Sequence, residues 1–354
     1  MVMEFTSPGP QVGAVIPSKS RVTSASFHAD GSKLFVASEA DSKLQIIDCQ
    51  AGKQSSPALR FEREGISLVE STHHDKCILI SGKGSADQQP SQRYAVSYHS
   101  IHDNKILRKF RGHNDTISSI SMSPSDDYFL SSSRDRTVRM WSLQQAGAVA
   151  QLELPAAAEG DPFAAFDSTG LVFGVTATMA AGQGHVSSLF SFFLQFSDLR
   201  INIIHHFKQY IHLYDARNYT GGAFAELKVT TAQLEKELTP QMARSEWTSM
   251  KFNASGNQIL VTGKNGLVLT LDGYEGTVQR SFSGKGTTSA CWTTDDKTIL
   301  TGADDGTISC WNADTGSVIR KLEGGNSGSI SWVGVNPKYS MFASCDTNTA
   351  MWIW

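Results

Sequence analysis

The sequence has little cysteine for its length. Five cysteines occur among 354 residues, and none stands in a Cys-x-x-Cys pair. An odd number of cysteines without metal-type spacing argues against a disulfide framework and against a zinc site. Three of the five fall within strand-like apolar runs. We therefore expect small buried hydrophobic residues in a protein that stays in a reducing compartment.

A strong charge of either sign is also missing. The 31 basic and 34 acidic side chains leave a net charge of -3, so we expect no direct binding of nucleic acid through phosphates. No apolar run reaches the roughly 18 residues that cross a bilayer, so no membrane contact is expected. The first residues, MVMEFTSPGPQVG, have neither a basic region nor an apolar one, which argues against a secretory signal. We expect a soluble intracellular protein.

The motifs that carry common enzyme chemistry are absent. There is no P-loop, no Gly-rich dinucleotide fingerprint, no His-Glu-x-x-His and no Gly-x-Ser-x-Gly. His73-His74 and His205-His206 are adjacent pairs. Neighbours on a strand point to opposite faces, so neither pair is expected to bind a metal. We expect no enzyme activity, no cofactor and no metal, and a function that depends on recognition by surfaces.

What the sequence does contain is a repeated unit, best formed from Gly112 to Ser142. The unit begins with Gly112-His113 and ends with Trp141-Ser142. Between them, three apolar segments are separated by turns rich in Ser, Pro, Asp and Arg, with alternation clearest in the first and third segments. This pattern predicts a meander of short antiparallel strands. A Gly-His start and a Trp-Asp-like end, at a period of about 40 to 45 residues, is the signature of a WD40 propeller blade.

The polar residues of this unit can form one buried chain of hydrogen bonds. Its members would be His113, either Ser131 or Ser133, Asp135 and Trp141. A buried carboxylate is tolerated when it accepts bonds from its neighbours, and it is costly when it does not. The alternative interpretation is that His, Asp and Ser form a catalytic set. The propeller pattern accounts for all three positions, so we expect the structural role.

Six further units follow the same plan, so we predict an all-β, seven-bladed WD40 propeller. Residues 1–11 are rich in Pro, Gly and Ser and are expected to be disordered, whereas residues 12–354 form the propeller. The last blade lacks a fourth strand, which Val12 to Ile16 can supply, so that the amino terminus closes the ring. The predicted strands, blade by blade, are 23–27, 34–37 and 44–47; 66–69, 77–81 and 94–98; 117–122, 128–130 and 138–141; 164–166, 171–175 and 211–214; 248–252, 259–262 and 267–271; 289–292, 299–301 and 308–311; 330–335, 341–344 and 350–354.

Three connections depart from the plan. The polar segment Gly82 to Arg93 is expected to be an exposed loop. Thr230 to Pro240 predicts a short surface helix, with Thr230 and Gln233 as a capping box and Pro240 as its stop. Blade four is interrupted by an atypical insertion at about residues 184–209, because Ser142 and Asp215 lie 73 residues apart where neighbouring units span 40 to 43.

Three interpretations of this insertion remain open. It is a partner-binding loop with an exposed apolar face, a helix packed on the side of the propeller, or a translated intron. Val186-Ser187 can be encoded by a sequence that resembles a splice donor, and Gln209 by one that resembles an acceptor. Removing Val186 to Gln209 takes out 24 residues and restores an interval of 49.

Several stretches resemble one WD40 family. The quoted motifs are Asp48-Cys49-Gln50-Ala51-Gly52-Lys53, His102-Asp103-Asn104-Lys105, Ser121-Met122-Ser123-Pro124 with Asp126-Asp127, Leu213-Tyr214-Asp215-Ala216-Arg217, Glu246-Trp247-Thr248 with Lys251-Phe252, and Asn336-Pro337 followed by Met341-Phe342-Ala343-Ser344. In their order they resemble the WD40 subunit of the COMPASS-type complex that methylates lysine 4 of histone H3. That family includes the propeller shared with the mRNA cleavage and polyadenylation factor and with a nuclear protein-phosphatase complex.

The resemblance implies a non-catalytic scaffold in the nucleus. It implies binding to the amino-terminal region of the SET-domain methyltransferase, to polyadenylation-factor or phosphatase-complex subunits, and to the phosphorylated tail of RNA polymerase II. The residues themselves define no phosphate pocket. Arg93, Arg134 and Arg136 are loop cations that can contribute to such contacts, although a solvated face is the simpler interpretation.

A second hypothesis belongs to a different class of protein. Tyr214-Asp215-Ala216-Arg217 resembles the Trp-Asp-x-Arg box by which some WD40 proteins dock on the adaptor of cullin-RING ubiquitin ligases. In that role Arg217 would project beyond the end of a strand and the protein would be a substrate receptor. The simpler interpretation is that Asp215 and Arg217 pair at the end of a blade.

Overall fold

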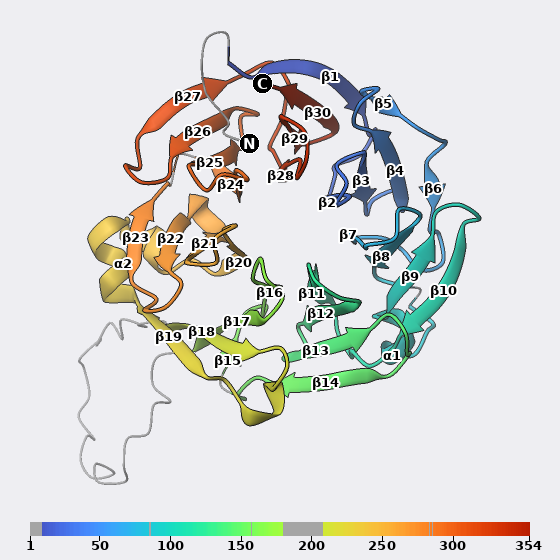
Figure 1. Ribbon diagram of the computed structural model, residues 1–354, viewed down its shortest axis with the longest axis horizontal. Coiled ribbons are helices and arrows are strands. Elements are labelled where there is room, and N and C mark those ends of the chain that lie inside the picture. Colours follow the sequence, from blue (N-terminus) through green and yellow to red (C-terminus); the bar gives the residue numbers. More distant parts are fainter. Residues whose placement is uncertain (1–8, 85, 157, 180–207, 283, 285) are drawn as a thin grey trace, which may run out of the picture.

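Short apolar strands such as Cys77–Ser81 are buried on both faces, because their sheets pack side by side around a central channel. In the computed structural model, which describes residues 9–84, 86–156, 158–179, 208–282, 284 and 286–354, the strands form seven antiparallel sheets. Figure 1 shows these sheets as blades in a closed ring, with one inner strand of each blade facing the centre. The predicted all-β, seven-bladed propeller is confirmed.

Blades one to three follow the order in which their strands occur in the chain. Blade one adds a broken outer edge made of two short strands. The bounds are β2 (Ser24–Phe27), β3 (Lys33–Ser38), β4 (Lys43–Asp48), β5 (Lys53–Gln54) and β6 (Leu59–Arg60); β7 (Leu68–Ser71), β8 (Cys77–Ser81), β9 (Val96–Ser100) and β10 (Lys105–Phe110); β11 (Ile117–Met122), β12 (Tyr128–Ser133), β13 (Thr137–Ser142) and β14 (Ala148–Glu153).

Blades four to six repeat this order, and blade four carries an extra short strand. The bounds are β15 (Ala158–Glu159), β16 (Ala164–Phe166), β17 (Val172–Met179), β18 (Lys208–Asp215) and β19 (Ala225–Thr230); β20 (Trp247–Phe252), β21 (Gln258–Gly263), β22 (Val268–Asp272) and β23 (Val278–Ser281); β24 (Thr287–Trp292), β25 (Thr298–Ala303), β26 (Ile308–Asn312) and β27 (Val318–Leu322).

Blade seven joins the two ends of the chain. It contains β28 (Trp332–Val335), β29 (Met341–Cys345) and β30 (Asn348–Ile353), and β1 (Gln11–Pro17) pairs antiparallel with β30 as the outermost strand. Figure 1 shows β1 beside β30 at the edge of the ring. Closure by the N-terminal strand is therefore confirmed. The strand already includes Gln11, so the predicted disordered stretch 1–11 is one residue too long, and residues 1–8 lie outside the described residues.

Small hydroxyl side chains tie neighbouring blades together at their inner strands. Ser26 Oγ accepts a hydrogen bond from the backbone N–H of Ser71, 3.1 Å away, and Ser119 Oγ accepts one from that of Ala164 at the same distance. Ser289 Oγ likewise accepts from the N–H of Val333 at 3.1 Å. The partners lie 44 or 45 residues apart, which is one blade. These bonds satisfy inner-strand backbone groups that have no neighbour within their own sheet.

The connections carry short helices. They are α1 (Pro90–Arg93), η1 (Tyr219–Gly221), α2 (Thr231–Glu237), α3 (Pro240–Ala243) and η2 (Lys264–Gly266). The predicted loop 82–93 thus contains one helical turn. Thr230 and Gln233 form the predicted capping box at the start of α2. α2 ends at Glu237, before the predicted stop at Pro240, and Pro240 also begins α3, because its fixed φ and missing N–H suit a first helical position.

The described residues also move one boundary of blade four. Residues 180–207, and so most of the predicted insertion at 184–209, lie outside the described residues. Gln209 belongs to β18, where it pairs with Thr178, and its Oε1 accepts a hydrogen bond of 2.6 Å from Thr178 Oγ1. The predicted insertion therefore ends two residues too late, because β18 already begins at Lys208.

Candidate functional site

The turns of blade three hold the predicted polar chain. Trp141 Nε1 donates to Ser131 Oγ at 2.8 Å, and Ser131 Oγ lies 2.7 Å from His113 Nε2. His113 Nδ1 lies 3.0 Å from Asp135 Oδ2. A neutral imidazole has one donor and one acceptor nitrogen, so the protons run in one direction from Trp141 to Asp135. Ser133 is not a link of this chain, since its hydroxyl donates to the carbonyl of Asp115 at 2.9 Å.

Burial and hydrogen bonding fix the charge of Asp135. Burial acts to raise its pKa, but hydrogen bonds from His113, from the N–H of Asn114 and from Thr137 outweigh burial and hold the pKa well below the usual range. The His113 and Asp135 side chains are 1% and 8% exposed. Ser131 is fully buried. A buried serine hydroxyl has no route to a substrate, so this geometry serves folding.

Blade seven contains a second chain of the same kind, which the sequence analysis missed. Trp352 Nε1 donates to Ser344 Oγ at 2.9 Å, and Ser344 in turn donates to Asn326 Oδ1. Asn326 Nδ2 then donates to Asp346 Oδ1 at 3.0 Å. An amide offers one acceptor and two donors, so Asn326 stands where His113 stands in blade three. The spacing of six residues from Asp346 to Trp352, equal to that from Asp135 to Trp141, is the signal that could have revealed it.

The loop cations proposed as partner contacts are engaged within the chain. Arg134 donates to both carboxylate oxygens of Asp161, at 2.8 and 2.9 Å, and this ion pair raises the arginine's pKa. Arg136 donates to the carbonyl of Ala156 at 2.9 Å. Arg93 lies at the end of α1 with its guanidinium carbon 5.3 Å from the centre of the Tyr94 ring. The structure therefore does not bring the three cations into one pocket.

Asp215 and Arg217 form a two-pronged ion pair at the end of β18. The Arg217 guanidinium donates to Asp215 Oδ1 at 3.1 Å and to Oδ2 at 3.0 Å, and the Arg217 N–H donates to Oδ1 at 2.8 Å. These bonds lower the pKa of Asp215 and raise that of Arg217. This geometry agrees with pairing at a blade terminus. The Arg217 side chain is still 71% exposed, so a docking role for it stays a prediction.

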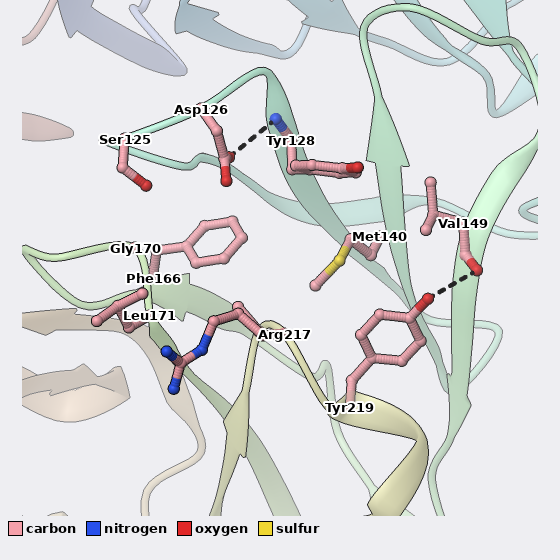
Figure 2. Close-up of a pocket in the computed structure, with 11 residues that line it drawn as sticks. Ser125, Asp126, Tyr128, Met140, Val149, Phe166, Gly170, Leu171, Arg217 and Tyr219 are labelled. Carbon is pink, nitrogen blue, oxygen red and sulfur yellow. Dashed lines mark hydrogen bonds between the residues drawn. The ribbon is translucent and has the colours of Figure 1, made fainter.

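Arg217 also borders a groove between blades three and four. The groove has a volume of about 310 Å³, and its lining includes Tyr128, Met140, Phe166 and Leu171. Figure 2 shows Met140 lying between the side chains of Phe166, Tyr128 and Tyr219. We call this the blade 3–4 groove. Its walls come from two blades, so no single repeat in the sequence reveals it.

The central channel is a second hollow, of about 520 Å³. Glu70 on β7 and Lys251 on β20 lie among its lining residues, together with Trp292 and Trp332. Burial raises the pKa of Glu70 to about 7, although Lys251, Ser26 and the backbone N–H of Met122 act to lower it. Glu70 could not be identified from the sequence, because an acidic residue on an inner strand does not disturb the repeat pattern.

The other polar candidates have local structural partners. His73 Nε2 lies 3.0 Å from the carbonyl oxygen of Ser123 and 3.1 Å from that of Asp126, so its ring nitrogen donates to a turn of blade three. His205 and His206 lie outside the described residues. All five cysteines are buried and free, and burial raises the pKa of four of these thiols, Cys49, Cys291, Cys310 and Cys345, to about 12.

Two structural features of the described part of the chain bear on function. No group of three His, Cys, Asp or Glu side chains there is arranged to hold a metal ion. No helix among those residues is long and apolar enough to span a membrane.

Comparison with known proteins identifies the repeat and the family. The family described as "WD domain, G-beta repeat" matches residues 104–142 and 276–312, which include most of blades three and six. WD repeat-containing protein 82 of Drosophila melanogaster is 32% identical over 338 residues, which cover 94% of this chain and 90% of the fly protein. The chain belongs to the family of WD repeat-containing protein 82. The resemblance inferred from the sequence is thereby confirmed.

Two fungal members of this family carry informative names. "COMPASS component SWD2" of Saccharomyces cerevisiae is 26% identical over 94% of this chain and 91% of its own length. "Set1 complex component swd2" of Schizosaccharomyces pombe is 27% identical over 80% of this chain and 69% of its own length. Both names place those proteins in multi-subunit complexes.

Proposed function

We propose that this chain is a non-catalytic adaptor subunit of a nuclear complex that methylates lysine 4 of histone H3. The observation that carries the proposal is its similarity to components of COMPASS and of the Set1 complex, which in the first case extends over 94% of the chain. This similarity extends around the whole ring, whose outer surfaces are supplied by all seven blades. Those surfaces are what a propeller uses to bind partners.

The geometry supports a binding role. The His113, Asp135 and Ser131 side chains, which resemble a catalytic set, are buried in blade three and bonded to one another and to Trp141, so their polar atoms are occupied. The blade 3–4 groove and the loops, by contrast, are open to partners. A rigid ring with open grooves can hold several proteins at once without chemistry of its own.

The proposed partners are ordered by their support from the names of relatives, which mention COMPASS and the Set1 complex. The first is the amino-terminal region of the SET-domain methyltransferase. Polyadenylation-factor or phosphatase-complex subunits, and the phosphorylated tail of RNA polymerase II, follow. A phosphorylated tail that used Arg134 or Arg136 would have to compete with Asp161 and with the carbonyl of Ala156.

The alternative role as substrate receptor of a cullin-RING ubiquitin ligase is not favoured. Arg217 is bound by Asp215 through two side-chain bonds, and the relatives with informative names belong to COMPASS and the Set1 complex.

Affinity purification of the tagged chain from its own cells, followed by mass spectrometry, tests the proposal. We expect SET-domain and polyadenylation or phosphatase subunits among the enriched proteins, in nuclear extract. An Arg217→Ala variant should recover the same set. Recovery of a cullin adaptor that disappears with Arg217→Ala, without any SET-domain protein, would contradict the proposal and support the alternative.

A further inference from the structure

The blade 3–4 groove continues into a second hollow of different chemistry. This neighbouring hollow, of about 450 Å³, shares Ser125, Asp126 and Tyr128 with the groove and reaches Asp127. We call it the acidic end. The two hollows meet at the turn between β11 and β12, so one bound segment can occupy both.

The groove itself offers apolar surface that the fold leaves uncovered. Met140 and Phe166 form its base and are 4% and 8% exposed, whereas Tyr128 and Leu171 at its mouth are 39% and 44% exposed. Covering exposed apolar side chains of this size removes apolar surface from water, which makes binding more favourable in free energy. The thioether of Met140 adapts to the shape of what enters. The groove is therefore suited to one large apolar side chain.

The acidic end carries negative charge without a counter-ion. Asp126 and Asp127 are exposed, and within the described part of the chain neither carboxylate forms an ion pair. No lysine or arginine lines this hollow, whose other residues include His73, Ser142 and Gln144. Asp126 Oδ1 accepts the N–H of Tyr128 at 3.2 Å, which orients this carboxylate. Such a hollow attracts a positively charged side chain.

The turn between the two hollows is held in place from both sides. On one side His73 donates to the carbonyls of Ser123 and Asp126. On the other side Gly170, at a φ of +74°, packs so closely that an added Cβ would lie 2.5 Å from Ser125 Oγ. The binding surface is thus formed before a partner arrives, which reduces the entropy lost on binding.

We propose that the blade 3–4 groove and its acidic end bind an extended peptide of a partner protein, in which a large apolar residue lies two positions from a lysine or arginine. Residues i and i+2 of an extended chain point to the same face, roughly 7 Å apart. The apolar side chain enters the groove, and the cation lies between Asp126 and Asp127. This inference rests on the proposed adaptor function and assigns a surface to it.

A direct binding assay tests the proposal with a defined probe. The probe is the fluorescein-labelled peptide Gly-Ser-Arg-Ser-Phe-Ser-Arg-Ser-Gly, whose symmetry makes the result independent of chain direction. We expect saturable fluorescence anisotropy with the full chain. Replacing Phe by Ser, or both Arg by Glu, should weaken binding at least tenfold, and added salt should weaken it further.

Protein variants with matched controls locate the site. Leu171→Ser should weaken binding at least fivefold, and the Asp126→Asn/Asp127→Asn pair at least tenfold. Leu107→Ser, at an exposed apolar residue on the outer strand of blade two, and Asp314→Asn, in an exposed turn of blade six, should leave binding unchanged. Thermal unfolding of each variant confirms that it is folded.

Two outcomes overturn the inference. One is the absence of saturable binding by the folded chain up to about 1 mM peptide, a range that includes weak complexes. The other is equal binding of the Ser-for-Phe peptide, or equal weakening by the control variants. Affinity purification with the combined Leu171→Ser/Asp126→Asn/Asp127→Asn variant separates the two proposals. If this variant recovers the SET-domain subunit undiminished, the adaptor function is supported and the role of the groove in binding is rejected. If the peptide binds as expected but the unaltered chain does not recover that subunit, the groove is supported as a binding site and the adaptor function is rejected.

Discussion

At the scale of single residues, the polar chains of blades three and seven show what such a chain requires. Each chain links a tryptophan indole to an aspartate through a serine and one further side chain, His113 or Asn326. Imidazole and amide share one property, which is to accept a hydrogen bond at one end and donate one at the other. The requirement is therefore a bridge of the right polarity and not a histidine as such.

Asp135→Ala should destabilise the protein far more than Asp305→Ala. Asp135 accepts from His113, the N–H of Asn114 and Thr137, so its loss orphans buried donors, and we expect a cost of about 3 kcal/mol. Asp305 is exposed and accepts only within its own turn, from Thr307, so about 1 kcal/mol or less is expected. Urea unfolding of both variants gives the comparison. Equal losses would show that the chain of blade three does not stabilise the fold.

Glu70→Gln should stabilise the protein in a pH-dependent way. Burial raises the pKa of Glu70 to about 7 in the folded state, against about 4.3 for an unfolded chain. The penalty for its charge is therefore absent below about pH 4, grows as the pH rises, and is complete above about pH 7. We expect the melting temperature to rise by about 2–4 °C at pH 8 and to stay nearly unchanged below about pH 4. Exposed Glu275 provides the control, and a Glu70→Gln effect of equal size at both pH values would contradict the assignment.

The residues of blade three could be predicted because their spacing matches a known repeat. The choice between Ser131 and Ser133 could not, since both lie on β12 and point to the same face. Only the depth of the hydroxyl decides, and Ser131 is the one that meets Trp141 and His113. The polar hydrogen-bond chain of blade seven was not predicted, because its bridging residue is Asn326 where a histidine was expected.

At the scale of elements, closure of the ring depends on β1. Its Ile16 belongs to a buried cluster that also includes Met341 and Met351 of blade seven. Deleting residues 1–18 removes this contact and every β1–β30 hydrogen bond, and leaves β30 as an open sheet edge. Truncating a buried isoleucine alone costs about 2–5 kcal/mol. We expect a clear drop in melting temperature by calorimetry, together with increased aggregation; an unchanged melting temperature would contradict closure by this strand.

Blade four should tolerate the loss of its interruption. β17 and β18 pair in register up to Met179 and Lys208, so the described ladder is complete at that point. Replacing residues 180–207 by a two-residue Asn-Gly turn, which suits a hairpin, should leave the melting temperature within about 3 °C of the unaltered chain. Extending the deletion through Gln209 should be worse, because Gln209 is buried and bonded to Thr178. Equal stability of the two deletions would place the boundary where the sequence interpretation first put it.

The sequence predicted the inner strands of each blade and, apart from β1 in blade seven, left out the outermost ones. Inner strands are buried, so their apolar residues form recognisable runs, as in Cys77–Ser81. Outer strands such as Val318–Leu322 are short and largely exposed, and their composition does not differ from that of a loop. Helix α2 was predictable from its capping box. Pro240 was predicted to stop this helix, but the sequence did not show that it also begins α3, because a proline gives the same local signal after one helix and at the start of the next.

At the scale of the whole molecule, the seven blades form one closed ring whose outer surface is available for contacts with partner proteins. The inner-strand serines join blades at intervals of 44 or 45 residues, so the repeat length also sets the fit between blades. The family could be recognised from ordered motifs along the chain. The blade 3–4 groove could not, because its apolar base and its acidic end come from side chains that meet only when neighbouring blades pack.

The most direct test of the account is the binding of purified chain to the amino-terminal region of the SET-domain methyltransferase from the same organism, measured by isothermal titration calorimetry. If the chain is the proposed adaptor, we expect a 1:1 complex with a negative heat-capacity change, because apolar surface is buried on binding. Asp135→Asn, which keeps the size of the buried side chain, serves as a control for effects of stability alone. No heat of binding from a chain that is folded by calorimetry, at concentrations well above about 10 µM, would contradict the adaptor function.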